Sequence, residues 1–133
     1  MAQMSTNEAQ AKLSGRLLLV DDNPTNLKVM NDLLIHIGLD VDQATDGFEA
    51  LKLCSENKYD LVLMDVQMPG MDGLEATRRI RNKLGGLAPV IIGVSAHVME
   101  EHIASAMKAG MTDYLCKPVS KTTLQLKLSE FLS

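Results

Sequence analysis

One stretch of the chain, residues 61–73, constrains the fold more than any other. It reads LVLMDVQMPGMDG, and its first four residues form an apolar run that is too short for a helix and typical of a buried strand in a parallel sheet. Asp65 follows directly, and residues 68–70 (MPG) have the composition of a turn. Asp72 and Glu75 have the spacing of a capping box, which opens a helix. The stretch predicts a strand, a loop and a helix, with Asp65 at the carboxyl end of the strand.

Four further segments have the character of strands. Residues 17–20 (LLLV), 90–94 (VIIGV) and 114–116 (YLC) are short apolar runs, and residues 39–44 (LDVDQA) alternate apolar and polar side chains, as suits an edge strand. Helical patterns with caps and terminal glycines separate the strands. The expected helices are residues 24–37 after Asn23, a segment opened by Asp46 and Glu49, residues 73–84, residues 99–109 before Gly110, and a last segment capped by Ser120.

Strands that alternate with helices predict an α/β fold with a parallel sheet covered on both faces. The common arrangement is the flavodoxin-like, doubly wound sheet of five strands in the order 2-1-3-4-5, with five helices. Helical spacing directs Phe48, Ala50, Leu51 and Cys54 toward the core, and Leu124, Leu128 and Phe131 share one face of the last helix.

Length and composition bound the remaining possibilities. The 133 residues suit one domain, which we place at residues 15–133 after a polar lead-in or linker, residues 1–14, that we expect to be disordered. A net charge of −4 without a basic block argues against nucleic-acid binding, and no apolar run is long enough to span a membrane. Without an apolar signal segment, and with Cys54 and Cys116 expected to be buried free thiols, we expect a cytoplasmic location.

The predicted strand ends bring polar residues together. The carboxyl ends of parallel strands share one edge of the sheet, where open α/β sheets bind ligands. This edge collects Asp21, Asp22, Asp65, Ser95 and Lys117. Each residue alone is more often a cap or a solvated loop residue, but two carboxylates about 4 Å apart repel by roughly 4 kcal/mol at an effective dielectric constant of about 20. A hard divalent cation such as Mg²⁺ is the natural neutralising partner.

The set of groups suits phosphoryl transfer. Asp65 is the candidate nucleophile, which becomes an aspartyl phosphate, while Lys117 and Mg²⁺ neutralise the charge that develops. Ser95 donates a hydrogen bond to a phosphoryl oxygen in this scheme. His36, His97 and His102 lack the spacing of a metal site, and no glycine-rich phosphate loop follows any strand.

From about Gly15 to its end, the chain resembles the receiver domain of two-component response regulators, which has the CheY-like form of this fold. LLLVDDNPTN and LVLMDVQMPGMDGLEATRRIR are most similar to the receivers of hybrid sensor histidine kinases. The resemblance implies that Asp65 accepts phosphate from a phosphohistidine. It also implies that Asp21, Asp22, Asp65 and the Gln67 carbonyl hold Mg²⁺ (or Mn²⁺), that Lys117 pairs with the phosphoryl group, and that the bond between Lys117 and Pro118 is cis.

The resemblance further implies a switch and partners. Ser95 and Tyr114 would be the switch pair, and Gln67 and His97 would tune hydrolysis of the aspartyl phosphate. The donor would be a histidine kinase dimerisation domain or a histidine phosphotransfer protein, docked beside Asn23 and Pro24. Met99, Met107 and Met111 are either adaptable contacts near the output surface or ordinary core residues. The hybrid-kinase pattern favours part of a longer kinase over a single-domain regulator.

Two other classes share parts of this pattern. An aspartyl-phosphate phosphohydrolase wants a second acid two residues after its nucleophile, where this chain has Gln67, and we expect no turnover of a separate substrate. A flavodoxin-like electron carrier has the same fold, but an acidic edge repels the flavin phosphate and no phosphate-binding loop follows the first strand. Activity on small phosphate esters would identify the first class, and flavin binding in place of Mg²⁺ would identify the second.

Overall fold

The fold is a five-stranded parallel sheet covered by helices on both faces. It was obtained as a computed structural model, which describes residues 13–96 and 99–132. The strand order is β2-β1-β3-β4-β5, as predicted. The elements are β1 (Arg16–Val20), α2 (Pro24–Ile37), β2 (Asp40–Ala44), α3 (Gly47–Glu56), β3 (Leu61–Asp65), α4 (Gly73–Leu84), a 3-10 turn (Gly85–Leu87), β4 (Val90–Ser95), α5 (Glu100–Ala109), β5 (Asp113–Cys116) and α6 (Lys121–Ser129).

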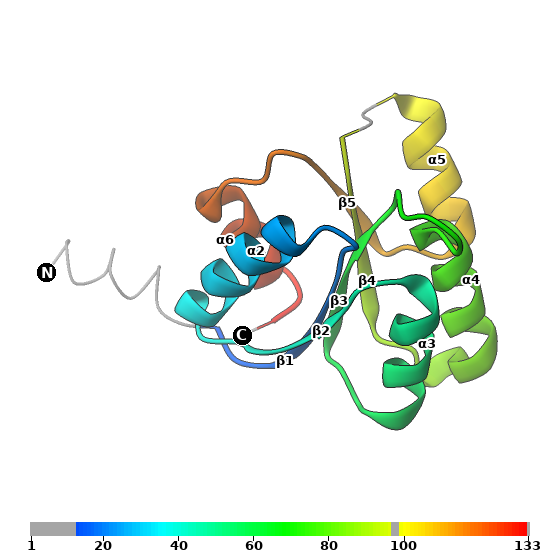
Figure 1. Cartoon of the computed structure of the whole chain (residues 1–133), viewed down its shortest axis with the longest axis horizontal. Coiled ribbons are helices and arrows are strands. Elements are labelled where there is room, and N and C mark those ends of the chain that lie inside the picture. Colours follow the sequence, from blue (N-terminus) through cyan, green and yellow to red (C-terminus); the bar gives the residue numbers. More distant parts are fainter. Residues whose placement is uncertain (1–12, 97–98, 133) are drawn as a thin grey trace, which may run out of the picture.

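Helices α2 and α6 cover one face of the sheet, and α3, α4 and α5 cover the other (Figure 1). The alternation of side chains along each strand divides the core into two clusters. Leu17, Leu19, Leu61 and Leu63 pack with α2 and α6. Leu18, Val20, Val62 and Met64 pack against the opposite helices. Because these strands are buried on both faces, their side chains on both faces are apolar. Their sequences are therefore continuous apolar runs and do not alternate between apolar and polar residues.

Strand β3 is central, and all five of its residues are buried. It pairs in parallel with β1 on one side and β4 on the other. The position of β2 at the edge agrees with its alternating sequence. Asp65 is the last residue of β3, so the geometry of the central strand fixes its backbone.

Caps begin most helices where the sequence predicts. The side chains of Asn23, Asp46, Asp72 and Ser120 accept hydrogen bonds from the first turns of α2, α3, α4 and α6. At the Asp72 capping box the Glu75 N–H donates to Oδ1 of Asp72, and the Glu75 carboxylate also pairs with Arg78 and Arg79. Helix α5 begins at Glu100 rather than at residue 99, since Met99 is its N-cap residue.

Two predictions about burial need correction, and one open alternative is decided. Phe48 is 60% exposed, because it lies in the first turn of α3 beside the buried Gly47, while Ala50 and Cys54 face the sheet. Cys116 is exposed at the end of the edge strand β5, whereas Cys54 is the predicted buried thiol and burial raises its pKa to about 11. Of the two alternatives for Met111, an adaptable surface contact or a core residue, its exposure of only 4% identifies the core residue.

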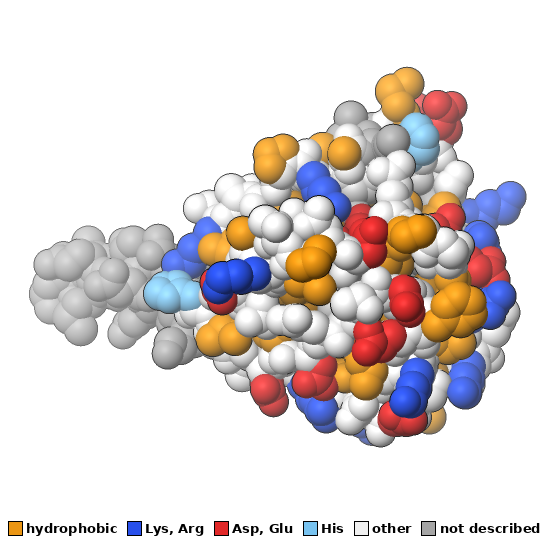
Figure 2. All heavy atoms as spheres, in the orientation of Figure 1, with side chains coloured by type: hydrophobic (Ala, Val, Ile, Leu, Met, Phe, Trp, Pro, Cys, Tyr) orange, Lys and Arg blue, Asp and Glu red, His pale blue; other side chains and the backbone are white. Residues whose placement is uncertain are grey.

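The surface carries charges of both signs. Basic and acidic side chains are intermixed over the face drawn in Figure 2, with single apolar side chains between them. At the amino end of the described chain, the Leu13 N–H donates to the Ile37 carbonyl at 3.0 Å. In the described part of the chain, none of the helices has the length and apolar character that a membrane span needs.

Candidate functional site

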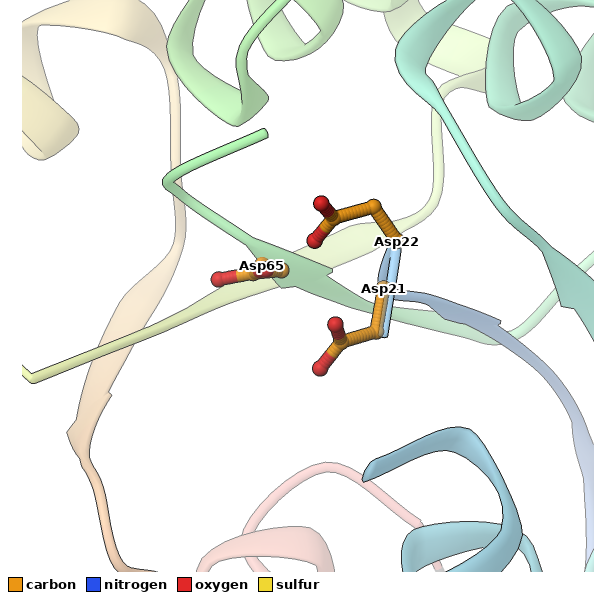
Figure 3. Close-up of side chains that lie close together, drawn as sticks. All are labelled: Asp21, Asp22 and Asp65. Carbon is orange, nitrogen blue, oxygen red and sulfur yellow. The ribbon is translucent and has the colours of Figure 1, made fainter. Parts of the chain in front are cut away.

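The predicted residues meet at the carboxyl edge of the sheet. Asp21 and Asp22 follow β1, Asp65 ends β3, Ser95 ends β4, and Lys117 follows β5. The side chains of Asp21 and Asp22 extend from the end of β1 toward Asp65 at the end of β3 (Figure 3). One carboxylate oxygen from each lies within 4.8 Å of the others. The convergence inferred from strand order is therefore present in the structure.

Lys117 is the cation that this cluster contacts directly. Its Nζ lies 3.2 Å from Oδ1 of Asp65 and 3.7 Å from Oδ2 of Asp21. The Gln67 N–H donates to the same Asp65 oxygen at 3.3 Å. The Asn23 N–H donates to Oδ1 of Asp21 at 2.9 Å, which fixes that carboxylate next to the start of α2. These contacts hold the carboxylates in place, but the cluster has more acid groups than Lys117 can neutralise.

The electrostatics of Asp65 record this imbalance. Its side chain is only 6% exposed, and burial raises the pKa of its carboxyl to about 6, with the negative charge of Asp21 adding to the effect. Contact with Lys117 lowers this pKa, but not enough to offset burial. A buried carboxylate with a raised pKa in an acidic cluster indicates a site built for an additional positive charge.

Glycine at position 73 allows the loop after Asp65 to fold back onto the strand. A Cβ at Gly73 would lie 2.2 Å from the Asp65 carbonyl oxygen and 2.8 Å from the Val66 Cα, which no side chain can accommodate. The Gly73 N–H donates to the Val66 carbonyl at 2.9 Å and closes the loop. This loop carries Gln67, so its backbone is held beside Asp65 by a contact that only glycine permits.

The expected switch residues lie on neighbouring strands. Ser95 is buried at the end of β4, where its carbonyl accepts from the Lys117 N–H at 2.8 Å. Tyr114 is half-buried in β5, opposite Gly93 of β4. The peptide bond between Lys117 and Pro118 is cis, as expected. His97, the other expected tuning residue, lies outside the described residues.

A groove beside Asp65 extends the site beyond the charged residues. It has a volume of about 470 Å³ and is lined by residues of α2 and of the segment after β5, together with Asp21, Asp65 and Lys117. Its apolar lining includes Val29, Met30, Leu33, Pro118 and Val119. One feature of the sequence points to this groove: Val29 is an apolar residue of α2 that lies outside the stripe facing the core. In the structure its side chain is 55% exposed.

Comparison with known proteins identifies relatives of the whole described fold. The model of the response regulator receiver domain family matches residues 17–129. The chain is 38% identical over 126 residues to the sensor histidine kinase GacS of Pseudomonas protegens, and 38% identical over 136 residues to the sensor protein EvgS of Escherichia coli. These matches cover 92% and 96% of this chain, but only 14% and 11% of the two relatives, so the chain spans a small part of their length.

Two solved structures agree with these matches. The receiver domain of a sensor histidine kinase from Pseudomonas aeruginosa, described with magnesium coordinated in its active-site cleft, is 36% identical and superposes with a TM-score of 0.82 over 89% of this chain and 97% of that one. The second is a co-crystal structure from Saccharomyces cerevisiae, of a histidine phosphotransfer protein with the receiver domain of its downstream response regulator. It is 27% identical with a TM-score of 0.83, over 91% of this chain and 90% of that one.

Proposed function

Since the chain belongs to the family of response regulator receiver domains, the receivers of two-component signalling, we propose that it accepts a phosphoryl group from phosphohistidine on Asp65. The observation that carries the proposal is the meeting of Asp21, Asp22 and Asp65, with oxygens within 4.8 Å, against Lys117 at 3.2 Å from Asp65. We place the receiver unit at residues 15–133, in the cytoplasm, where the free Cys54 thiol is stable.

The residues divide the work of the transfer step. A carboxylate oxygen of Asp65 forms a bond to phosphorus while the bond from phosphorus to the imidazole nitrogen breaks, and its electron pair stays on that nitrogen. Lys117 already contacts Asp65 and neutralises charge on the phosphoryl oxygens as they arrive. Ser95, at the end of β4, donates a hydrogen bond from its hydroxyl to one of these oxygens.

The donor set fits a hard divalent cation. Asp21, Asp22, Asp65 and the Gln67 carbonyl would hold Mg²⁺ or Mn²⁺, because such ions prefer oxygen ligands from few carboxylates and retained water. Burial and the negative charge of Asp21 raise the pKa of Asp65, so a bound cation would favour its charged form. When bound, the ion supplies charge neutralisation for the acid cluster and for the phosphoryl group.

Phosphorylation then acts as a local charge event on a bistable element. In the proposed switch, the Ser95 side chain moves toward the phosphoryl group and the Tyr114 ring turns into the space behind it. Gln67, which is exposed in the loop between β3 and α4, and His97 set how fast water reaches the aspartyl phosphate. The readout surface comprises α5, β5 and α6, where Met99 and Met107 are exposed.

The groove beside Asp65 is the proposed docking site for the phosphohistidine donor. Its apolar wall on α2 leads directly to Asp65 and Lys117, so a helix lying along it would bring a histidine to the acceptor. The donor is a histidine phosphotransfer protein or a kinase dimerisation domain. A structural neighbour of this chain is a receiver in complex with a histidine phosphotransfer protein, which supports this choice.

Val29→Asp should slow transfer from such a donor and leave labelling by a small phosphodonor unchanged.

Intact mass after incubation with acetyl phosphate tests the proposal. The wild-type chain should gain one phosphoryl group only when Mg²⁺ is present, and Asp65→Asn should gain none. The matched control is Asp42→Asn, which removes a carboxylate from the same sheet but far from the site and should be labelled like wild type. A hydroxylamine-sensitive, Mg²⁺-dependent phosphate on Asp65→Asn would refute Asp65 as the acceptor.

A further inference from the structure

Strand β4 has a glycine at the position that faces Tyr114. Gly93 is the partner of Tyr114 in the ladder between β4 and β5. A Cβ at position 93 would lie 2.4 Å from Sδ of Met111, 3.1 Å from its Cε and 3.3 Å from Cδ1 of Tyr114. The methionine and the tyrosine ring therefore meet over this glycine, in space that any other residue at 93 would take.

The Met111 side chain is held there by an anchored turn. Nε of Arg81 donates to the Gly110 carbonyl at 2.8 Å, and Nη2 of Arg81 donates to the Thr112 hydroxyl at 3.1 Å. The Ile91 N–H also donates to this hydroxyl at 3.1 Å, and the Thr112 N–H donates to the Ile91 carbonyl at 2.6 Å. The backbone on both sides of Met111 is thus tied to α4 and β4, so Met111 presents a fixed contact to its neighbours.

This contact lies next to the proposed switch. Side chains alternate along a strand, so positions 93 and 95 of β4 are on the same face. Ser95 is therefore one alternation away from the place where Met111 meets the Tyr114 ring. Any movement of the ring toward Ser95 changes its packing on Met111, because both side chains contact the same point above Gly93.

We propose that Met111 and Gly93 are positioning residues for Tyr114: Met111 fills the space that a side chain at 93 would occupy and sets the resting position of the ring. The inference rests on the proposed function, because the ring matters only if Tyr114 switches. The contact of a sulfur with an aromatic ring and the volume at this point decide the balance between the two ring positions.

The two positions should act in opposite directions. Met111→Ala removes the contact and leaves space beneath the ring. Gly93→Ala adds a methyl group that would lie 2.4 Å from Sδ of Met111 and 3.3 Å from the ring, so it displaces the methionine and crowds the ring away from the sheet. In the double variant the added methyl enters the space that the methionine left, so the ring should return toward its wild-type position. Such mutual rescue distinguishes a shared packing site from two separate structural defects.

Fluorine NMR of chains labelled with 3-fluorotyrosine measures the ring directly. The chain has two tyrosines, so the spectrum has two signals. Tyr59 is the internal reference for the fold, since it is buried and its hydroxyl donates to Asp42 at 2.6 Å. Spectra are recorded without and with Mg²⁺ and beryllofluoride, a stable mimic of the phosphoryl group. Tyr59→Phe assigns the signals.

We expect Met111→Ala and Gly93→Ala to move the Tyr114 signal of the free chain in opposite directions, with the Tyr59 signal unchanged. Each should alter the beryllofluoride concentration at half-saturation by about fivefold, the lower end of measured couplings between sites. The double variant should return both quantities close to wild type. The control Leu87→Ala removes an exposed apolar side chain from the 3-10 turn after α4, outside the proposed site and readout surface, and should change neither.

Tyr114 signals and half-saturation values that match wild type in both single variants would overturn the inference. If Met111→Ala fails to fold, Gly93→Ala decides alone, because an unchanged Tyr114 signal in that variant contradicts the contact. If beryllofluoride does not move the Tyr114 signal of the wild-type chain, the proposed function is contradicted, and this inference with it. If beryllofluoride moves the Tyr114 signal by the same amount in wild type and variants, only the inference about Met111 and Gly93 is contradicted.

Discussion

Two aspartates of the same sheet have opposite electrostatic environments. Asp65, at the carboxyl end of β3, lies among other carboxylates with Lys117 as its cation, and burial raises its pKa to about 6. Asp42, on β2, accepts from the Tyr59 hydroxyl at 2.6 Å and from Nη2 of Arg16 at 2.9 Å. These hydrogen bonds, that of Tyr59 foremost, lower the pKa of Asp42.

The difference separates scaffold from function. The cluster of Arg16, Asp42 and Tyr59 is satisfied within the chain: the Arg16 guanidinium also lies 5.2 Å from the centre of the Tyr59 ring. Its charges stabilise the edge strand β2 and need no further partner. The cluster around Asp65 sets three carboxylates against Lys117, and we propose that its excess of acid serves to bind a cation and is held in place by the rest of the fold.

Removing the Asp65 charge should give the largest change in stability. At pH 7.5 without divalent cation, Asp65→Asn should raise the free energy of unfolding, by about 1 to 3 kcal/mol, because a pKa shift of one unit corresponds to about 1.4 kcal/mol. Urea unfolding followed by circular dichroism measures this change. A destabilised Asp65→Asn would mean that the acidic cluster contributes to folding, against the contrast drawn above.

The unfolding free energy of the wild-type chain should depend on pH because of the same raised pKa of Asp65. The folded pKa of Asp65, about 6, is above its ordinary value of 3.8, so between these values the folded state binds a proton that the unfolded state lacks. Without divalent cation, ionisation of Asp65 therefore lowers the free energy of unfolding as the pH rises through 6. As the pH falls toward 4, Asp65 becomes protonated in the folded state and this loss of stability is reversed. The difference in unfolding free energy between wild type and Asp65→Asn should shrink over that range, and a constant difference would contradict the assignment.

Removing the Asp42 charge should have the opposite sign and a smaller size. Asp42→Asn weakens a charge-assisted hydrogen bond with Tyr59 and the pair with Arg16, so we expect a loss of about 1 to 2 kcal/mol at pH 7. Because the folded pKa of Asp42 is lowered, its contribution is present above pH 3.8 and is lost as the pH falls through the folded pKa. Acid titrations of wild type and Asp42→Asn should therefore converge at low pH.

An exposed aspartate sets the lower limit of the comparison. Asp32 pairs with Lys28 one turn away on α2, at 3.3 Å, with both side chains more than 60% exposed. Asp32→Asn should change the unfolding free energy by less than about 0.5 kcal/mol, because solvent screens such pairs. A change as large as that of Asp42→Asn would show that exposure does not decide the effect of these carboxylates.

Much of the fold could be predicted because its signals are local. Short apolar runs, helix caps and terminal glycines fixed the strands and helices, and the rule that parallel strands align their carboxyl ends brought Asp21, Asp65 and Lys117 together. The resemblance added roles for residues that local physics left open, such as Gln67 and Tyr114.

The features that sequence reasoning missed depend on contacts between distant elements. For Met111 the sequence left a core position and a surface contact open, and only the structure shows that Gly93 of β4 leaves room for its side chain. Arg81 reads as a surface residue of α4, yet its guanidinium binds the backbone before β5, and burial lowers its pKa. Cys116 is exposed because it is the last residue of β5, which is at the edge of the sheet. The apolar residues next to it in the sequence give no sign of this exposure.

The most direct measurement is the unfolding free energy of wild type, Asp65→Asn and Asp42→Asn at pH 7.5, as Mg²⁺ is titrated. The account predicts that Mg²⁺ stabilises wild type and Asp42→Asn equally, by about 1.4 kcal/mol at tenfold its dissociation constant. Asp65→Asn, with fewer charged ligands, should gain much less. Equal stabilisation of all three chains, or none in wild type, would contradict the claim that the acid cluster at Asp65 is built for a cation.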